Sequence, residues 1–359
     1  MTKNDIQDKC LELLKAHNRA SVALSMGTGK TLLGLKHMQL NYGNKFLVIA
    51  PKVSIFESWK EEAKFHNLEY LLKDISYCTY RSLSKIDLSQ YDILYLDEVH
   101  NLLYSHNKNL SLYNGNIVGL TGTPPKILKS EKGWMVDTFC PIIYNYKTDE
   151  AINDKLLNNY QIIVHLLDLN EQKTIKVNDK FYTSELASYN YWSNRIEDAR
   201  NPKELQICRI MRMKVLKDFE SKEKYVINLL KTITNKCLIF ANTQIQAEKL
   251  CKYTYHSKNP ESKVNLELFK KGDINTLAAV EQLNEGINIP NLREGFILHS
   301  YGNERKASQK IGRFLRLNVE DTSIIHILCY RNTIDEYWVK SALENFEQGK
   351  ITWNNKNLK

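Results

Sequence analysis

Short, almost uninterrupted apolar runs recur along the first third of the chain and alternate with stretches of helical periodicity. The runs lie at 21–24, 46–50, 75–78, 93–96 and 117–120. Residues 5–18 form the first helical stretch, with Asp5 available as its N-cap. Because strands that are buried on both faces carry continuous apolar runs, the pattern predicts a mainly parallel sheet flanked by helices.

The same alternation returns in the second half of the chain. Apolar runs lie at 162–164, 237–240, 277–280, 295–298 and 324–328, which predicts a second α/β lobe. Between them, at about 173–234, the pattern becomes helical and predicts a helical insert. One face of this insert is expected to carry an apolar stripe of Ile207, Ile210, Met211, Val215 and Phe219.

The length fits this division, because 359 residues are too many for one ordinary domain and suit two. We therefore expect a first lobe at 1–148 and a second lobe at 149–345 that contains the insert. A polar tail at 346–359 is expected to fray.

Composition narrows the class of protein. With 43% hydrophobic and 25% charged residues, the chain is typical of globular proteins rather than of disordered or fibrous ones. The sequence has neither a run long enough to span a membrane nor an apolar leader, so we expect a cytoplasmic protein. Its seven cysteines are scattered without a C-x-x-C pair, which indicates reduced structural thiols rather than a zinc site. The net charge of +9 fits a polyanionic partner, although many basic proteins bind none.

A glycine-containing loop follows the first predicted strand and precedes a helix, the context that a phosphate-binding loop requires. Glycines let backbone N–H groups approach phosphates, a lysine can reach the β and γ oxygens, and a threonine can hold Mg²⁺. Leu24 stands where the full pattern has its first glycine, so an ordinary strand-to-helix turn remains an alternative. The loop residues are Met26, Gly27, Thr28, Gly29, Lys30 and Thr31.

Two acids, Asp97 and Glu98, close the apolar run at 93–96. Open α/β sheets place ligands at the carboxyl ends of their strands. We expect Asp97 to hold Mg²⁺ through water, and Glu98 to orient and deprotonate an attacking water. Acids at strand ends are also common turn residues, but the upstream loop favours the catalytic interpretation.

In this order, the motifs resemble those of superfamily 2 helicases over most of the chain. Residues 48–52 with 59–62 look like motif Ia of Swi/Snf-type translocases, 79–83 like their motif Ib, 97–100 like a DExH box, and 120–125 like motif III. The resemblance implies two RecA-like lobes and places nucleic-acid contacts at Lys52, Ser54, Arg81, Thr121 and Thr123. Loop residues of this kind can also be structural turns.

Upstream of the phosphate loop, Gln7 lies at a distance that suits the adenine-reading glutamine of the family. A glutamine on a helix surface would fit the spacing equally well, so both interpretations stay open.

The second lobe continues the resemblance. Residues 238–243 look like motif IV and 285–290 like motif V, whereas 309–316 fit motif VI, Q-x-x-G-R-x-x-R. Asn288 stands where many relatives have Asp. By this resemblance, we expect Asn242 and Thr243 to contact nucleic acid and Gly286 and Asn288 to contact the nucleotide. We expect three further residues to act in catalysis: Gln309, Arg313 and Arg316.

Arg313 and Arg316 are three residues apart, so on a helix they would share one face. Arginine fingers stabilise charge on the γ-phosphate through a planar, always charged group. A solvated basic helix face is the alternative, and Gln309 and Gly312 at matching positions favour the fingers.

Together, these motifs imply a nucleic-acid motor that depends on ATP and Mg²⁺ and hydrolyses ATP at the interface of two lobes. We expect it to be a monomer and to act on DNA in preference to RNA. A helicase that unwinds DNA is expected first, with a duplex-DNA translocase and an RNA helicase as alternatives. The first lobe resembles Swi/Snf-type translocases, whereas the second resembles phage annealing helicases and restriction or excision-repair relatives.

The helical insert carries both aromatic and cationic side chains. Such a mixture suits contact with nucleic acid, but it also suits a half-buried helical surface. These residues are Tyr189, Tyr191, Trp192, Arg195 and Arg200.

Overall fold

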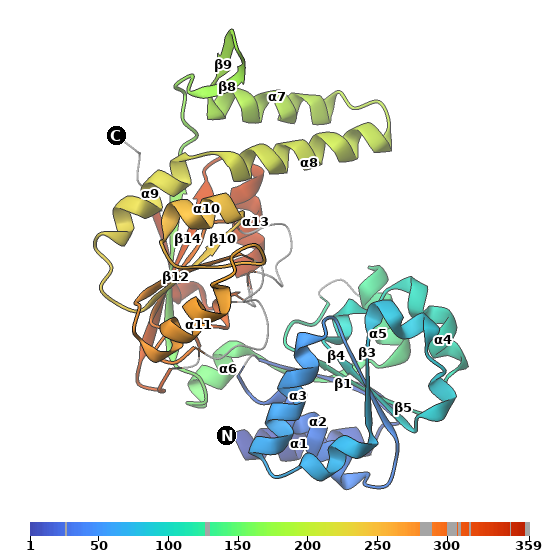
Figure 1. Ribbon diagram of the computed structural model, residues 1–359. Coiled ribbons are helices and arrows are strands. Elements are labelled where there is room, and N and C mark those ends of the chain that lie inside the picture. The colour runs from blue at the N-terminus through green and yellow to red at the C-terminus, as the bar shows by residue number, and fades with distance from the viewer. Residues whose placement is uncertain are drawn as a thin grey trace. The chain divides into compact units, whose positions relative to one another are not determined.

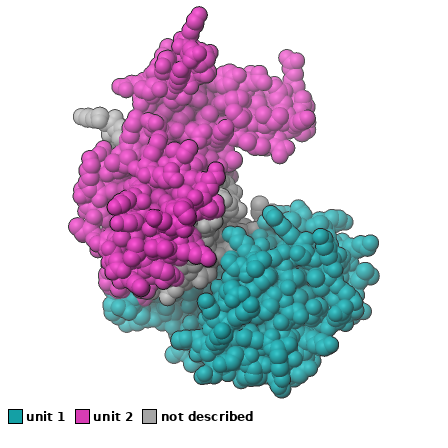
Figure 2. Space-filling view, viewed as in Figure 1, with its two compact units in different colours: residues 1–158, 318–320 teal, residues 159–317, 321–359 magenta. Residues whose placement is uncertain are grey.

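The computed structural model describes residues 1–25, 27–125, 130–280, 289–299, 307, 310–315, 317–344 and 346–355. The chain divides into two compact units, coloured separately in Figure 2. Unit 1 comprises residues 1–158 and 318–320, and unit 2 comprises residues 159–317 and 321–359. The first unit therefore extends ten residues past the expected end of the first lobe at 148, because helix α6 (Thr148–Asn153) clusters with it.

Unit 1 contains a six-stranded sheet in the order β3-β2-β4-β5-β1-β6, and all of its paired strands are parallel. Its strands are β1 (Arg19–Leu24), β2 (Phe46–Ala50), β3 (Ile75–Thr79), β4 (Ile93–Asp97), β5 (Asn116–Thr121) and β6 (Ile142–Tyr146). Strands β2 and β4 are buried along their whole length, as their continuous apolar sequences predict. Each of β1 to β5 ends at a segment that carries an expected site residue.

The remaining elements of unit 1 are helices (Figure 1). The α-helices are α1 (Lys3–Lys15), α2 (Lys30–Leu40), α3 (Ser54–Phe65), α4 (Asn107–Leu112), α5 (Glu131–Phe139) and α6. The 3-10 helices, written η, are η1 (Glu69–Asp74), η2 (Tyr80–Lys85), η3 (Leu88–Gln90), η4 (Val99–Asn101) and η5 (Tyr104–His106). A buried cluster that includes Leu96, Val99, Leu102 and Leu110 packs η4 and α4 beneath the end of β4, which fixes the segment after the acid pair.

Unit 2 contains a seven-stranded sheet in the order β11-β12-β10-β13-β14-β7-β15, again with only parallel pairs among the described strands. Its strands are β7 (Asn159–Leu167), β10 (Cys237–Ala241), β11 (Thr254–Tyr255), β12 (Thr276–Val280), β13 (Glu294–Ile297), β14 (Thr322–Tyr330) and β15 (Ile351–Asn355). Apart from the insert, its described helices include α9 (Ser221–Leu230), α10 (Gln244–Leu250), α11 (Ser262–Lys271), α13 (Ile334–Leu343) and the 3-10 helix η7 (Gln348–Lys350). The predicted α/β class with two mainly parallel sheets is confirmed.

Two features of unit 2 differ from the expected pattern. The tail expected to fray contains β15, which pairs in parallel with β7, so residues 351–355 form an edge strand. The insert begins with an antiparallel hairpin of β8 (Ile175–Asn178) and β9 (Phe181–Thr183) before its helices α7 (Glu185–Glu197) and α8 (Pro202–Asp218), which lie side by side in Figure 1. Both additions consist of strands of three to five residues, too short for their sequence pattern to mark them as strands.

Only part of the apolar stripe expected on α8 is buried. Ile207 and Ile210 are 51% and 49% exposed, whereas Cys208 and Leu216 are buried. Val215 and Phe219 do pack in the buried core of unit 2, so the expected stripe is covered only toward the C-terminal end of α8. No helix in the described ranges is both long and apolar enough to cross a bilayer.

Candidate active site

The loop between β1 and α2 has the backbone of an anion-binding turn. Gly27 and Gly29 adopt left-handed φ angles of 85° and 87°, a region that glycine enters without strain. Thr28 is buried, and its hydroxyl donates to the carbonyl of Ser25 at 2.6 Å. Leu24, which replaces the first glycine of the full pattern, is the last residue of β1 and is fully buried. The loop therefore starts at Ser25 and is shorter than the full motif, while Met26 lies outside the described residues.

The N-terminus of α2 adds to this potential for binding anions. Gly29 is the N-cap of α2, and within the described residues no side chain caps the helix. Lys30 and Thr31 open its first turn, which carries no acid. Backbone N–H groups and the helix dipole are therefore available to an anion at this end of α2.

Gln7 of α1 lies directly against this loop. Its side chain is fully buried, and neither amide atom has a hydrogen-bond partner among the described residues. A Cβ atom added to Gly29 would stand 2.7 Å from Gln7 Nε2, so a side chain at this left-handed position would displace the amide as well as strain the backbone. An unsatisfied buried amide is costly unless a ligand completes it, and the edge of a purine base offers a matching donor and acceptor. The residues present therefore fit a purine nucleotide.

The acid pair lies at the carboxyl end of β4. Lys30 Nζ stands 3.8 Å from Glu98 Oε1, which joins the phosphate loop to the second acid. Glu98 itself has φ 50° and ψ 56°, a left-handed conformation that is unusual for a residue with a side chain. Strained backbone of this kind persists where the surroundings hold it, often at functional sites.

A tryptophan orients the first acid. Trp59 of α3 is fully buried, and its indole Nε1 donates to Asp97 Oδ2 at 2.9 Å. Its ring lies against Gly34 of α2, where an added Cβ atom would stand only 2.4 Å from Trp59 Cη2. Trp59 thus connects the helix after the phosphate loop to the acid pair.

Burial and neighbouring charges shift the pKa values of the two carboxyl groups in opposite directions. Burial raises the pKa of Asp97 to about 6, reinforced by the charge of Glu98 and opposed by Trp59 and Lys30. Burial also raises the pKa of Glu98, but Lys30, His100 and nearby hydrogen-bond donors more than offset it, so this pKa is lowered from its ordinary value. Glu98 is therefore held as a carboxylate, the form that can accept a proton.

Thr121, at the end of β5, completes the surroundings of the acid pair. Its hydroxyl donates to Glu98 Oε2 at 3.3 Å and lies 2.9 Å from His100 Nδ1. The backbone N–H of Thr123 donates to the same hydroxyl at 3.1 Å. Thr121 is fully buried, so its side chain serves the acid pair, and a direct contact with nucleic acid would require a surface position that it lacks.

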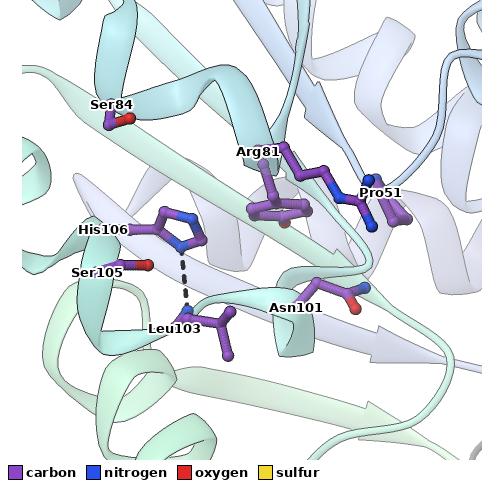
Figure 3. Close-up of a pocket in the computed structure, with 8 residues that line it drawn as sticks. Pro51, Arg81, Ser84, Asn101, Leu103, Ser105 and His106 are labelled. Carbon is purple, nitrogen blue, oxygen red and sulfur yellow. Dashed lines mark hydrogen bonds between the residues drawn. The ribbon is translucent and has the colours of Figure 1, made fainter.

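A pocket of about 320 Å³ opens beside the acid pair within unit 1. We call it the Arg81 pocket, and Figure 3 shows Arg81 extending toward Pro51 on one side of it, with Ser105 and His106 on the other. It is lined by Pro51, Tyr80, Arg81, Ser84, Asn101, Leu103, Ser105 and His106. Of the expected nucleic-acid contacts, Arg81 lines it, and the exposed Lys52 and Ser54 follow Pro51 closely in sequence. Sequence reasoning missed the other lining residues, which carry no motif of their own.

The expected residues of unit 2 are described only in part. Arg313 is 5% exposed and lies in a turn after Ile311, so the expected helix does not extend over it. Thr243 caps α10 through its hydroxyl, which accepts from the N–H of Gln246 at 3.1 Å, and the side-chain amide nitrogen of Asn242 is buried without a partner among the described residues. Four expected site residues of unit 2 lie outside the described residues: Gly286, Asn288, Gln309 and Arg316.

Two family models match the chain. Residues 2–126 match the model described as type III restriction enzyme, res subunit, and residues 221–318 match the helicase conserved C-terminal domain. Each match covers one of the two sheets in part, and together they include the phosphate loop, the acid pair and Arg313.

Relatives and solved structures agree with these models. The chain is 25% identical to the DNA 3'-5' translocase XPB2 of Sulfurisphaera tokodaii over 91% of its own length and 82% of that protein. It is 20% identical to putative helicase 22 of a Sulfolobus islandicus filamentous virus, over 95% of its length and 61% of that protein.

Among solved structures, the DNA-bound type ISP restriction-modification enzyme LlaBIII matches 98% of the chain with a TM-score of 0.65 and 13% identity. The chain spans 31% of that enzyme. S. cerevisiae Dbp5 bound to RNA and ADP with beryllium fluoride matches 98% of the chain and 89% of Dbp5, with a TM-score of 0.59 and 13% identity. At these identities, the two structures show the fold alone.

Proposed function

The chain belongs to superfamily 2 of the helicases, with two RecA-like lobes, and from this premise we propose that it is a DNA helicase that uses ATP hydrolysis to unwind or remodel DNA. Its membership makes it an ATPase, and enzymes of this superfamily use ATP with Mg²⁺. The observation that carries the proposal is the buried acid pair, placed 3.8 Å from the phosphate-loop lysine and hydrogen-bonded to Trp59.

Different residues of unit 1 would have different roles in ATP hydrolysis. Lys30 and the amides of the loop would hold the phosphates, Thr31 and Asp97 would hold Mg²⁺, and Gln7 would contact the base. When bound, ATP with Mg²⁺ supplies the phosphoryl group whose transfer to water releases energy. Glu98, kept as a carboxylate, accepts a hydrogen bond from the attacking water and then its proton at the free carboxylate oxygen.

The residues of motif VI complete the proposal. Arg313, with Arg316, would supply positive charge to the γ-phosphate, and Gln309 would act beside them. Gly286 and Asn288 of motif V would contact the nucleotide. Lys52, Ser54, Arg81, Thr123, Asn242 and Thr243 remain the proposed nucleic-acid contacts.

A second candidate function is translocation on duplex DNA without strand separation. It is favoured by the 25% identity to a protein named as a DNA translocase, which aligns over most of both chains. The same relative favours DNA over RNA as the partner, and an RNA helicase is therefore the third choice.

ATPase rates measured with single-stranded DNA, duplex DNA, forked DNA and RNA test the function directly. We expect stimulation by DNA that weakens as salt rises, because phosphate contacts release counterions. Lys30→Ala serves as the inactive control, since it removes the cation beside Glu98. Lack of stimulation by all four polymers would refute a nucleic-acid motor, whereas stimulation by duplex without unwinding of forked DNA would favour translocation.

A second expected result concerns Trp59. Trp59→Phe keeps a ring in the buried space but removes the indole donor to Asp97, so Asp97 loses the bond that orients it. Removing a partner that orients a metal ligand costs about tenfold to 100-fold in metal affinity. We expect the Mg²⁺ concentration that half-saturates ATPase to rise by about tenfold, and the thermal stabilisation by Mg²⁺ with ATP to shrink.

The matched control is Trp134→Phe, because Trp134 is 42% exposed on α5 and its ring lies 5.8 Å from that of Tyr104. It should leave the Mg²⁺ dependence unchanged. If Trp59→Phe also leaves it unchanged, the indole hydrogen bond has no role in positioning Asp97.

A further inference from the structure

Two residues that line the Arg81 pocket are hydrogen-bonded to the backbone of the acid pair. The hydroxyl of Tyr80 donates to the carbonyl oxygen of Asp97 at 3.0 Å. The side-chain amide of Asn101 donates to the carbonyl oxygen of Glu98 at 3.0 Å. The backbone of each acid is therefore hydrogen-bonded to one residue in the wall of a pocket that opens to solvent.

Tyr80 is placed to respond to what fills the pocket. It begins η2, directly after β3, and its side chain is 6% exposed while that of Arg81 is exposed. Its ring packs at 5.8 Å from His106, whose Nδ1 accepts from the N–H of Leu103 at 3.0 Å. A ligand that shifts η2 against η5 would move the Tyr80 hydroxyl relative to Asp97.

Asn101 holds the strained part of the acid pair. Its backbone N–H also donates to the carbonyl of Glu98, at 2.9 Å, so one residue makes two hydrogen bonds to the same oxygen. These bonds close the turn that keeps Glu98 in its left-handed conformation. Displacement of Asn101 would therefore release the backbone that aims the Glu98 carboxylate.

The lining chemistry fits a sugar-phosphate backbone. Arg81 offers a guanidinium group, Ser84 and Ser105 offer hydroxyls, and Pro51 and Leu103 offer apolar surface. Among the described residues that line the pocket, none is acidic. Arginines and hydroxyls are the side chains that proteins use to position phosphates, and a volume near 300 Å³ is at the small end of ligand pockets.

We propose that a segment of the nucleic-acid strand occupies the Arg81 pocket and that Tyr80 and Asn101 couple this occupation to the acid pair. The proposal rests on the proposed function, because it explains how nucleic acid would stimulate hydrolysis. Arg81 binds the strand, whereas Tyr80 and Asn101 are positioning residues that act through the backbone of Asp97 and Glu98.

The test separates binding from coupling in the full-length protein. ATPase is measured against increasing concentrations of the polymer that stimulates the wild type most among single-stranded DNA, duplex DNA and RNA. Tyr80→Phe removes only the hydroxyl, and Asn101→Ala removes only the side-chain amide and its bond. We expect each variant to lower the ratio of the polymer-saturated ATPase rate to the basal rate by about fivefold, because a typical hydrogen bond contributes about that factor. The polymer concentration that gives half of the stimulation should not change.

Arg81→Ala should show the opposite behaviour. It should raise the polymer concentration that gives half of the stimulation, and it should reduce the salt dependence of binding by about the amount expected for one phosphate contact. The ATPase rate at saturating polymer should not change. Lys85→Ala is its matched control, because Lys85 is exposed on the same η2 helix but does not line the pocket.

Tyr77→Phe is the matched control for the hydroxyl. Tyr77 lies on β3, and its buried hydroxyl has no hydrogen-bond partner among the described residues, so its basal and stimulated rates should equal those of the wild type. Circular dichroism melting verifies the folding of each variant, and Asn101→Ala keeps the test open if Tyr80→Phe fails to fold.

The outcomes distinguish the two proposals. A stimulated wild type with unchanged ratios in Tyr80→Phe and Asn101→Ala overturns the coupling and leaves the motor intact. A wild type that no nucleic acid stimulates overturns both the proposed function and the coupling.

Discussion

Replacing Glu98 by Gln should lower kcat for ATP hydrolysis by about 10³-fold, within the range for loss of a general base. The amide has the size and shape of the carboxylate but cannot take a proton from water. Lys30, His100 and the neighbouring hydrogen-bond donors outweigh burial and hold Glu98 as a carboxylate, and glutamine has no such charged form for them to stabilise. Single-turnover and steady-state phosphate release measure the change.

Binding of ATP should survive in Glu98→Gln, because Lys30 and the loop amides remain. A fluorescent ATP analogue should therefore bind with an affinity near that of the wild type. Glu57→Gln is the control, since Glu57 pairs with Lys60 on the surface of α3 at 2.8 Å and should turn over normally. A kcat within tenfold of the wild type would falsify the assignment of Glu98 as the base.

Replacing Arg313 by Ala should lower hydrolysis by roughly 10³-fold, the effect attributed to arginine fingers. The expected cause is loss of positive charge at the γ-phosphate as negative charge develops there. Arg313→Lys should recover little, because lysine keeps the charge but lacks the planar group with its paired donors. ATP affinity should stay near that of the wild type, measured with the same fluorescent analogue.

Arg313 is 5% exposed, so a loss of packing must be separated from a loss of catalysis. Thermal melting of each variant makes that separation. Arg293→Ala is the matched control, because Arg293 is in the same unit and pairs with Asp321 at 2.7 Å with its side chain 42% exposed. Turnover of Arg313→Ala at the wild-type rate would remove Arg313 from the mechanism.

The strands of the sheets were largely predictable, because burial on both faces leaves a direct record in the sequence. The apolar run at 46–50 is β2, and the run at 93–96 becomes β4 with Asp97 as its last residue. The edge strand β15 and the strands of the insert do not have such a continuous apolar run. In β15, Ile351 and Trp353 alternate with polar residues over only five positions, and pairing with β7 supplies what the local pattern lacks.

The insert shows a limit of periodicity. Ile207 and Ile210 share a helical face with Met211 and Val215, yet they are about half exposed. Val215 packs beside the buried Leu216 in the core of unit 2, so the stripe is covered only toward the C-terminal end of α8. Periodicity identifies a helix and its apolar face, but the packing partners decide how much of that face is covered.

Within the site, sequence order identified the groups that the structure brings together in unit 1. Lys30 and Glu98 are 68 positions apart in the chain and meet at 3.8 Å, because β1 and β4 end at the same edge of one sheet. The roles of Trp59, Tyr80 and Asn101 were not predictable. Their hydrogen bonds to the acid pair depend on the packing of α3, η2 and η4, which spacing along the chain does not encode.

The contact between Gly34 and Trp59 has a consequence for how this lineage can change. Any side chain at position 34 would overlap the indole ring, and loss of the indole would leave both a cavity and an unsupported Asp97. The two positions are therefore epistatic, since a side chain at position 34 is tolerated only after the indole at position 59 has been lost. Homologues with a larger residue at the position of Gly34 should lack the tryptophan and orient their first acid with a donor from another element.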